Sequence, residues 1–262
     1  MVEDGPETVL AGGSVNHVVR VGSTVRRPTG AWTQSVHDLL RHLERVGFDG
    51  APRVLGIDDQ GREVLTFLEG VAASRPWPSV LHTEVGLARF ARRLHRYHEA
   101  VASFEPPENA RWRAGPMRLQ EGQIVSHGDL GPWNSIWQDE TLVGLIDWEF
   151  AEPRWPIEDV AETAWYFVPL QGARVWREAG FEVAPQFGRR LAVLCEAYND
   201  FTVEEVVDAL LRRQQLERQR TIDLCADGVS PWNRFLARGD VKQFDQEHAW
   251  LELHRDDLVA RH

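Results

Sequence analysis

The sequence contains very little cysteine and no long apolar run. Its two cysteines, Cys195 and Cys225, belong to no CxxC pair, which argues against a disulfide framework or a structural zinc site. No segment approaches the roughly 20 apolar residues that a membrane-spanning helix needs. The acidic start, MVEDGPETVL, lacks the pattern of a signal peptide. These absences predict a protein of the reducing cytoplasm with no membrane association.

Positive charge is also scarce. The formal net charge is -11 and the pI about 5.4, and no basic patch stands out, so we expect no nucleic-acid partner. Lys242 is the only lysine in the sequence. Every other residue in the combined total of lysine and arginine is therefore an arginine. An acidic surface suits a cationic small molecule, but it equally keeps an ordinary protein soluble. The oligomeric state is left open.

The most informative segment runs from Ile124 to Glu149 and reads IVSHGDLGPWNSIWQDETLVGLIDWE. Asp129 follows a predicted strand at Ile124 to Ser126, Asn134 lies five residues later, and Asp147 ends an apolar run. Phosphoryl transfer from a nucleotide needs a carboxylate that accepts the acceptor hydroxyl's proton, and an amide and a second carboxylate that hold magnesium. The pattern therefore predicts a kinase that acts on small molecules.

Each of these residues also has a simpler interpretation. Asp129 and Asn134 are common turn residues, and Asp147 is common at the end of a strand. Their joint spacing favours the catalytic roles: Asp129 as general base, with Asn134 and Asp147 as magnesium ligands. His127 is expected to support the loop through a backbone hydrogen bond. Glu149 is open between assisting the site and an ordinary surface position.

The first seventy residues predict a small sheet with one helix. Strand patterns occur at 17–21, 23–26, 53–57 and 63–67, and Asp58 to Gly61 reads as a hairpin turn. Val36, Leu39, Leu40, Leu43 and Val46 recur at helical spacing. We therefore expect residues 1–70 to form a nucleotide-binding lobe and hinge.

Residues 71–262 are expected to form a larger, mostly helical lobe. A stripe from Leu87 to Val101 follows a plausible cap at Thr83. The motif segment adds two short strands, at 135–137 and 142–146. Thr202 and Glu205 form a capping box before another helix. The fold class is thus α+β, with a sheet-rich first lobe and a helical second lobe that holds the catalytic loop and acceptor site.

Phosphate contacts in the first lobe are less specific. Gly12-Gly13-Ser14 precedes a strand, and such a turn can lay backbone N–H groups over phosphates, although it equally makes an ordinary turn. Because the first lobe has no lysine, we expect Arg26 to stand over the α- and β-phosphates, with Arg27 on the other face of the strand. The alternative is a solvated arginine. His37, Asp38 and Glu44 are the polar groups available on the following helix to hold the cation.

The motifs HGDLGPWN and LIDWE resemble those of the aminoglycoside phosphotransferase and choline kinase group, the small-molecule branch of the protein-kinase-like fold. The resemblance covers most of the chain. It implies a two-lobed fold, ATP (or GTP) with Mg²⁺, and transfer of the γ-phosphoryl group to an acceptor hydroxyl. It assigns Asp129, Asn134 and Asp147 to catalysis, Gly13, Ser14 and Arg26 to the nucleotide, and Phe67, Leu68 and Glu69 to the base-binding hinge.

The resemblance leaves the acceptor open. An aminoglycoside-type antibiotic is the most concrete expectation, because acidic side chains of the second lobe suit ammonium groups. The alternatives are a metabolite kinase of the choline, homoserine or sugar type, and a nucleotide-binding module with weak activity. Tryptophans such as Trp133, Trp148, Trp155 and Trp165 would favour a sugar or a quaternary ammonium, but core packing is their usual role. Two departures from the family matter: the strand lysine is replaced by arginine, and no acid is evident on the helix.

Overall fold

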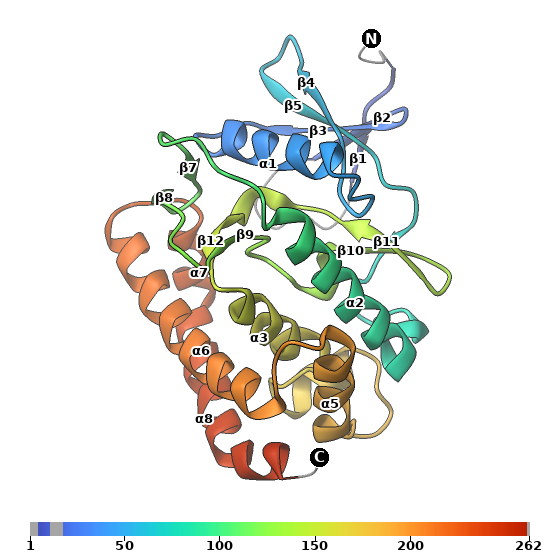
Figure 1. Ribbon diagram of the computed structural model, residues 1–262, viewed down its shortest axis with the longest axis vertical. Helices are drawn as coiled ribbons and strands as arrows, with labels where there is room; N and C mark the ends of the chain where they lie inside the picture. The colour runs from blue at the N-terminus through green and yellow to red at the C-terminus, as the bar shows by residue number, and fades with distance from the viewer. Residues whose placement is uncertain (1–4, 11–17, 261–262) are drawn as a thin grey trace. The chain divides into compact units, whose positions relative to one another are not determined.

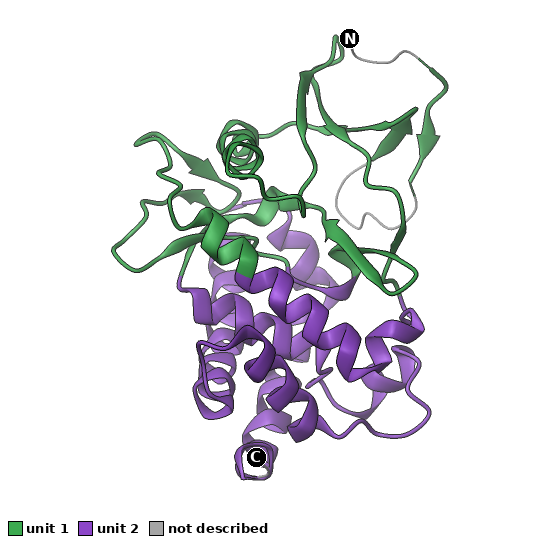
Figure 2. Ribbon diagram, turned by 45° about the vertical axis from the view of Figure 1, so that its right-hand side comes forward, with its two compact units in different colours: residues 1–74, 96–129, 133–154 green, residues 75–95, 130–132, 155–262 purple. Residues whose placement is uncertain are grey.

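The computed structural model describes residues 5–10 and 18–260. The chain divides into two compact units, coloured separately in Figure 2. Unit 1 comprises residues 1–74, 96–129 and 133–154, and unit 2 comprises residues 75–95, 130–132 and 155–262. The predicted lobe boundary at residue 70 lies close to the first change of unit, but the chain then returns twice to unit 1. The catalytic loop and the strands that flank it consequently fall mainly in unit 1.

A five-stranded antiparallel sheet forms one end of unit 1, with the order β1-β2-β3-β5-β4 (Figure 1). Its strands are β1 (Thr8–Val9), β2 (Val19–Val21), β3 (Thr24–Pro28), β4 (Val54–Ile57) and β5 (Arg62–Thr66). Helix α1 (Thr33–Arg45) lies beside this sheet and buries Val36, Leu39, Leu40 and Leu43.

The turn signals of the sequence act as predicted in this region. Asp58 closes the hairpin between β4 and β5, because its carboxylate accepts the backbone N–H groups of Gln60 and Arg62. Gly47 follows α1 with a positive φ of 79°, which glycine adopts without steric cost.

The rest of unit 1 carries the motif segment. Strands β6 (Val71–Ala72), β10 (Ser135–Gln138) and β11 (Thr141–Leu145) form a second sheet, with β10 in the middle. Strand β9 (Ile124–Ser126) pairs with β12 (Glu152–Arg154). A small hairpin joins β7 (Arg111–Trp112) to β8 (Gly115–Pro116), and η2 (Pro132–Asn134) and η3 (Trp148–Phe150) are single 3₁₀ turns. Strands β1, β6, β7, β8 and β12 were not predicted, because two- and three-residue strands are too short to show a period.

Unit 2 is helical. Its elements are η1 (Ser79–His82), the first part of α2 (Glu84–Val101), α3 (Pro156–Phe167), α4 (Ala173–Glu178), α5 (Phe187–Tyr198), α6 (Val203–Ala226), α7 (Trp232–Arg238) and α8 (Asp240–Val259). Helix α6 packs against α3, α7 and α8 (Figure 1). The capping box is confirmed, since Thr202 Oγ1 accepts from the Glu205 N–H at 3.2 Å while the Glu205 carboxylate accepts from the Thr202 N–H at 2.8 Å.

The predicted fold class is confirmed: a small antiparallel sheet with one helix, and a mostly helical remainder. Trp148 and Trp165 are 2% and 1% exposed, so both belong to the cores of their units, whereas Trp133 and Trp155 keep 37% and 46% of their surface exposed. Over the described residues, none of the helices combines the length and the apolar character needed to cross a membrane.

Candidate active site

The loop after β9 brings Asp129 and Asn134 into direct contact. Asn134 is buried, and its Nδ2 donates to Asp129 Oδ2 at 2.8 Å and to the Asp129 carbonyl at 2.9 Å. The Asn134 amide nitrogen therefore fixes the Asp129 carboxylate, and its Oδ1 is the atom that can accept a cation. Asp129 itself is only partly buried, so its carboxylate remains accessible.

Gly128 is required at the start of this loop. Its φ is +81°, and a Cβ at this position would lie 1.9 Å from the carbonyl oxygen of Phe150. Both the left-handed backbone and the close approach of the next segment exclude a side chain. The glycine of the HGD motif thus lets the loop pack against the backbone just beyond Asp147.

Ile146 ties Asp147 to the same loop. The Ile146 N–H donates to the Asn134 carbonyl at 2.9 Å, and its carbonyl lies 3.0 Å from His127 Nε2. The structural role predicted for His127 is confirmed, because this fully buried ring bonds a backbone oxygen. Asp147 therefore directly follows Ile146, whose backbone is hydrogen-bonded to both His127 and Asn134, at the two ends of the catalytic loop.

Asp147 has an unusual backbone. Its φ of 65° and ψ of 57° place it in the left-handed region, which few residues other than glycine adopt, although aspartate tolerates it better than most. Its side chain is 37% exposed. A strained, partly exposed carboxylate at the end of a buried strand is typical of a functional position.

Arg27 on β3 binds the Asp147 carboxylate. Its guanidinium Nη1 lies 2.7 Å from Asp147 Oδ1, its Nε 2.6 Å from Glu63 Oε1, and its Nη2 3.1 Å from Glu149 Oε2. One buried guanidinium thus contacts three carboxylates. Burial by itself lowers the pKa of Arg27, but the three carboxylates outweigh it and the pKa is raised above its ordinary value.

Glu149 is held by a second arginine. Arg113 Nη1 lies 2.8 Å from Glu149 Oε2, and the Glu149 side chain is only 1% exposed. The Arg113 guanidinium lies over the rings of Trp32 and Phe150, at 4.1 and 5.0 Å from their centroids. Burial lowers the pKa of Arg113, and Glu149 opposes this shift. Glu149 is therefore a buried anchor rather than a surface acid.

Arg26, the predicted phosphate contact, has partners of its own. It is 3% exposed, donates to Thr24, and lies 3.6 Å from Asp58 in the hairpin turn. Successive strand residues point to opposite faces, and sequence alone does not say which face meets Asp147. The structure assigns that face to Arg27.

The helix residues considered as partners of Arg26 have other contacts. His37 bonds Glu63 at 2.9 Å, Asp38 accepts from Gln34, and Glu44 lies 3.8 Å from Arg53. The acid that pairs with the strand cation is Glu63, on β5. The sequence analysis did not identify the cluster of Arg27, Glu63 and Arg113. Pairing of β3 with β5 could have indicated part of it, because that pairing places Glu63 opposite Arg27.

The predicted hinge has its own interactions. The Phe67 N–H donates to Ser23 at 2.8 Å, Leu68 lies beside Gly144, and Glu69 lies 2.5 Å from Arg20. The Arg20 guanidinium stacks 3.7 Å above the Phe67 ring. The other predicted nucleotide contacts, Gly13 and Ser14, lie outside the described residues.

The donor set is compatible with magnesium only when other ligands contribute. Among the described residues, no group of three or more His, Cys, Asp and Glu side chains forms a metal site of its own. Asp147 offers a partly exposed carboxylate and Asn134 an amide oxygen, both hard oxygen donors. Mg²⁺ characteristically binds one or two protein groups and completes its shell with phosphates and water, which fits this pair.

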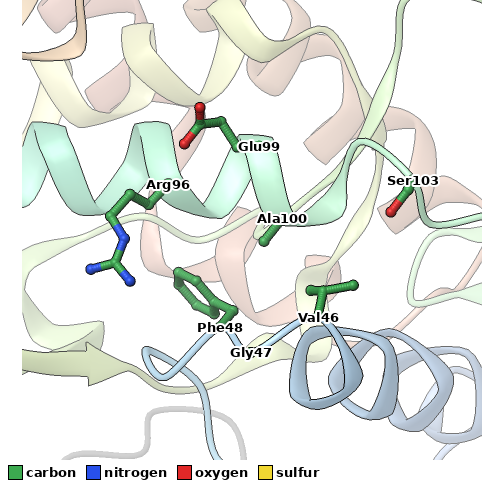
Figure 3. Close-up of a pocket in the computed structure, with 7 residues that line it drawn as sticks. All are labelled: Val46, Gly47, Phe48, Arg96, Glu99, Ala100 and Ser103. Atoms are coloured by element: carbon green, nitrogen blue, oxygen red, sulfur yellow. The ribbon is translucent and has the colours of Figure 1, made fainter.

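A separate hollow of about 320 Å³ lies between the end of α1 and the last turns of α2 (Figure 3). It is lined by Val46, Gly47, Phe48, Arg96, Glu99, Ala100 and Ser103. Arg96 and Glu99 leave α2 in opposite directions, and Arg96 lies 3.6 Å from Asp49. None of the predicted catalytic residues lines this hollow, so it is not the candidate active site.

Sequence comparison gives two matches. The model of the phosphotransferase enzyme family matches residues 107–189, a range that includes Asp129, Asn134 and Asp147. A trifolitoxin immunity protein from Rhizobium leguminosarum bv. trifolii is 38% identical over 197 residues, which cover 73% of this chain and 74% of that protein.

Solved structures of similar fold include two kinases. The ADP-bound aminoglycoside phosphotransferase APH(2'')-Ib has a TM-score of 0.61 at 14% identity, over 95% of each chain. A choline/ethanolamine kinase family protein from Mesorhizobium loti has a TM-score of 0.58 at 18% identity, over 95% of this chain and 93% of that one. The family model and the relative agree, and the chain belongs to the phosphotransferase enzyme family.

Proposed function

We propose that the protein transfers the γ-phosphoryl group of ATP, with Mg²⁺, to a hydroxyl group of a small molecule. The observation that carries this proposal is the contact between Asp129 and Asn134 at 2.8 Å, together with the hydrogen bonds from Ile146 that bring Asp147 to the same loop. GTP is the alternative donor.

Asp129 acts as the general base in this proposal. Its Oδ2 is oriented by Asn134, and the Trp133 Nε1 lies 3.5 Å from the same oxygen. A partly buried carboxylate oriented by an amide can orient the acceptor hydroxyl and receive its proton. The half-exposed Trp133 ring next to it would contact the acceptor.

Asn134 and Asp147 would hold the magnesium ion. There, a bound ion would supply positive charge to stabilise the transferring phosphoryl group. The residues fit this role, because Asn134 Oδ1 is an oxygen donor on an amide whose nitrogen already bonds Asp129, and the Asp147 side chain is 37% exposed. Arg26 would meet the α- and β-phosphates, and Arg27, which contacts Asp147, is the alternative cation on the same strand.

The nucleotide base would bind the backbone of Phe67, Leu68 and Glu69, and Gly13 and Ser14 would contact the phosphates. These roles follow from the family resemblance. The predicted lobes, 1–70 and 71–262, also remain a proposal, as do the cytoplasmic location and the absence of membrane and nucleic-acid partners.

The acceptor is proposed as an aminoglycoside-type compound. Aminoglycoside phosphotransferases are among the similar folds, and the chain is acidic, which favours ammonium-bearing molecules. Metabolites of the choline, homoserine or sugar type are the alternative, and the choline/ethanolamine kinase family protein supports it. A nucleotide-binding module with weak activity is the reading that a failed assay would favour.

A second function is suggested by the relative that is 38% identical, a trifolitoxin immunity protein. By this proposal, the protein protects its cell from a toxin by phosphorylating a toxin hydroxyl. The two functions share one chemistry and differ in the acceptor.

One assay separates these proposals. The protein is incubated with Mg²⁺ and ATP or GTP, and release of the diphosphate is followed with aminoglycosides, choline, homoserine, common sugars and trifolitoxin. Turnover with one acceptor identifies the function, and mass spectrometry of that acceptor locates the phosphate. Turnover with none of these acceptors, while nucleotide still binds, would contradict the kinase proposal and favour the binding module.

A further inference from the structure

Arg27 and Glu63 face each other across neighbouring strands. In the antiparallel pairing of β3 with β5, Arg27 is directly opposite Glu63, and its Nε lies 2.6 Å from Glu63 Oε1. Directly opposed residues in a sheet have closely spaced side chains, so the register alone holds this pair together. The strand cation therefore receives its acid from the sheet and not from α1.

Helix α1 supplies a histidine in place of an acid. His37 Nε2 lies 2.9 Å from Glu63 Oε2, and the two side chains are 3% and 2% exposed. In protein kinases the strand lysine pairs with a glutamate of the helix, and movement of the helix controls activity. Here the acid stays opposite the cation whether or not the helix moves, and α1 only supports it.

The guanidinium group of Arg27 contacts the carboxylates of both Glu63 and Asp147. Nε lies 2.6 Å from Glu63, Nη1 donates to Asp147 at 2.7 Å, and Nη2 donates to Glu149 at 3.1 Å. Glu63 and Glu149 are almost fully buried, whereas Asp147 is 37% exposed. Of the three carboxylates, Asp147 is therefore the one that solvent or a metal ion can reach.

We infer that Glu63 is a positioning residue: it draws Arg27 toward the sheet and so sets how readily Asp147 accepts a divalent cation. The inference rests on the proposed function, in which Asp147 is a magnesium ligand. Arg27 and a bound metal ion would compete for one carboxylate, because Arg27 already contacts it and both are cations. A carboxylate on the opposite strand weakens the hold of Arg27 on Asp147 and favours the metal.

The first test removes the charge of Glu63 with little change of volume. In Glu63→Gln, the guanidinium has only Asp147 and Glu149 as charged partners, so its bond to Asp147 strengthens. We expect the dissociation constant for Mn²⁺ alone, measured by electron paramagnetic resonance of the free ion, to rise about tenfold or more, as for coupling between close charges. Glu44→Gln is the matched control, since Glu44 is half-exposed and lies 3.8 Å from Arg53, and its Mn²⁺ affinity should equal that of the parent.

The second test keeps the buried charge and changes its reach. In Arg27→Lys, one ammonium replaces the guanidinium fork and cannot contact all three carboxylates. We expect Asp147 to be released, Mn²⁺ to bind severalfold more tightly, and phosphoryl transfer to slow. The two variants thus shift metal affinity in opposite directions, which simple loss of structure would not do. Arg26→Lys, on the same strand, should change Mn²⁺ affinity less than Arg27→Lys.

The outcomes separate the inference from the function on which it rests. Asp147→Asn should abolish Mn²⁺ binding; if it does not, the metal assignment is overturned and the inference with it. If Asp147→Asn abolishes binding but Glu63→Gln binds Mn²⁺ as the parent does, only the inference is overturned. Should Glu63→Gln lack a cooperative unfolding transition, Arg27→Lys decides: unchanged or weaker Mn²⁺ binding overturns the inference, and tighter binding supports it.

Discussion

Several buried charges are held differently in the two units, although the buried Arg213 of unit 2 also pairs with the carboxylates of Glu158 and Glu217. In unit 1, the guanidinium groups of Arg27 and Arg113 pair with the carboxylates of Glu63, Asp147 and Glu149. In unit 2, Arg190 donates to the carbonyls of Leu81, His82 and Phe167, with distances from 2.9 to 3.2 Å. There, Glu247 accepts from Trp165, Gln171 and Gln243.

The pKa values of Arg27, Arg190 and Glu247 shift in different directions, although burial also lowers the pKa of Arg113 in unit 1. Burial lowers the pKa of Arg190 to about 10, and burial raises the pKa of Glu247, because in each case desolvation exceeds the help that neighbouring groups give to the charged form. For Arg27, paired carboxylates reverse the effect of burial. Arg27, at the candidate active site, is thus held in its charged form. In unit 2, by contrast, the buried carboxyl group of Glu247 binds a proton more readily than usual.

The largest expected effect tests whether the chemistry belongs to the loop of unit 1. Asp129→Asn removes the proposed base but keeps the side-chain size, so turnover should fall about a thousandfold while nucleotide affinity stays within about threefold. Steady-state kinetics and calorimetric nucleotide binding measure the two quantities. Asp139→Asn is the control, because this exposed turn residue has a positive φ that asparagine tolerates. Normal turnover of Asp129→Asn would contradict the assignment of the base.

The next effect concerns stability of the charge cluster. Arg113→Met leaves the buried Glu149 with a single arginine, and loss of one partner from a buried pair costs about 3–5 kcal/mol. Urea unfolding followed by fluorescence measures the change in the free energy of unfolding. Arg111→Met, at an exposed position two residues earlier, should change that free energy by less than about 0.5 kcal/mol. If the two substitutions changed the free energy of unfolding equally, Arg113 in the cluster would stabilise the protein no more than the exposed Arg111 does.

Gly128 gives a smaller but specific prediction. Gly128→Ala combines a positive φ with a 1.9 Å approach to the Phe150 carbonyl, so we expect a loss of about 2–4 kcal/mol and displacement of the catalytic loop. Gly61→Ala shares the positive φ, at +76°, but has nothing within 4 Å of the added carbon, and should cost about 1 kcal/mol. Thermal unfolding of both variants compares them, and a smaller cost for Gly128→Ala would contradict the close contact.

The smallest effect tests the titration of Glu247 in unit 2. Its pKa is raised in the folded protein, so the folded state binds the proton more tightly than the unfolded state. Stability from this group is therefore fully present below its ordinary pKa of 4.5 and is lost as pH rises through the raised value. Glu247→Gln should cost about 1 kcal/mol at acidic pH and less as pH rises. Unfolding free energies from pH 4 to pH 8 should show no such trend for the exposed Glu252→Gln, on the same helix.

Local sequence signals predicted much of the fold and part of the site. The turn at Asp58, the stop at Gly47 and the cap at Thr202 depend on neighbouring residues only, and each is present. The loop from His127 to Asn134 is also local, so its hydrogen bonds could be anticipated from spacing.

The ionic cluster could not be predicted, because it depends on contacts between distant segments. Choosing Arg27 over Arg26 requires knowing which face of β3 meets Asp147, and identifying Glu63 requires the β3–β5 register. Arg113 lies in a segment without a clear period and is placed by the rings of Trp32 and Phe150. Such contacts are set by tertiary packing, which a single sequence does not display.

The pairing of Arg27 with Glu63 across the sheet has a consequence for how this chain tolerates change. A one-residue insertion in the turn between β4 and β5 that shifted β5 by one position would move Glu63 to the opposite face and bring Arg62 or Val64 across from Arg27. Surface turns usually tolerate insertions. In this protein the length of the β4–β5 turn is constrained, because it sets the position of Glu63 opposite Arg27.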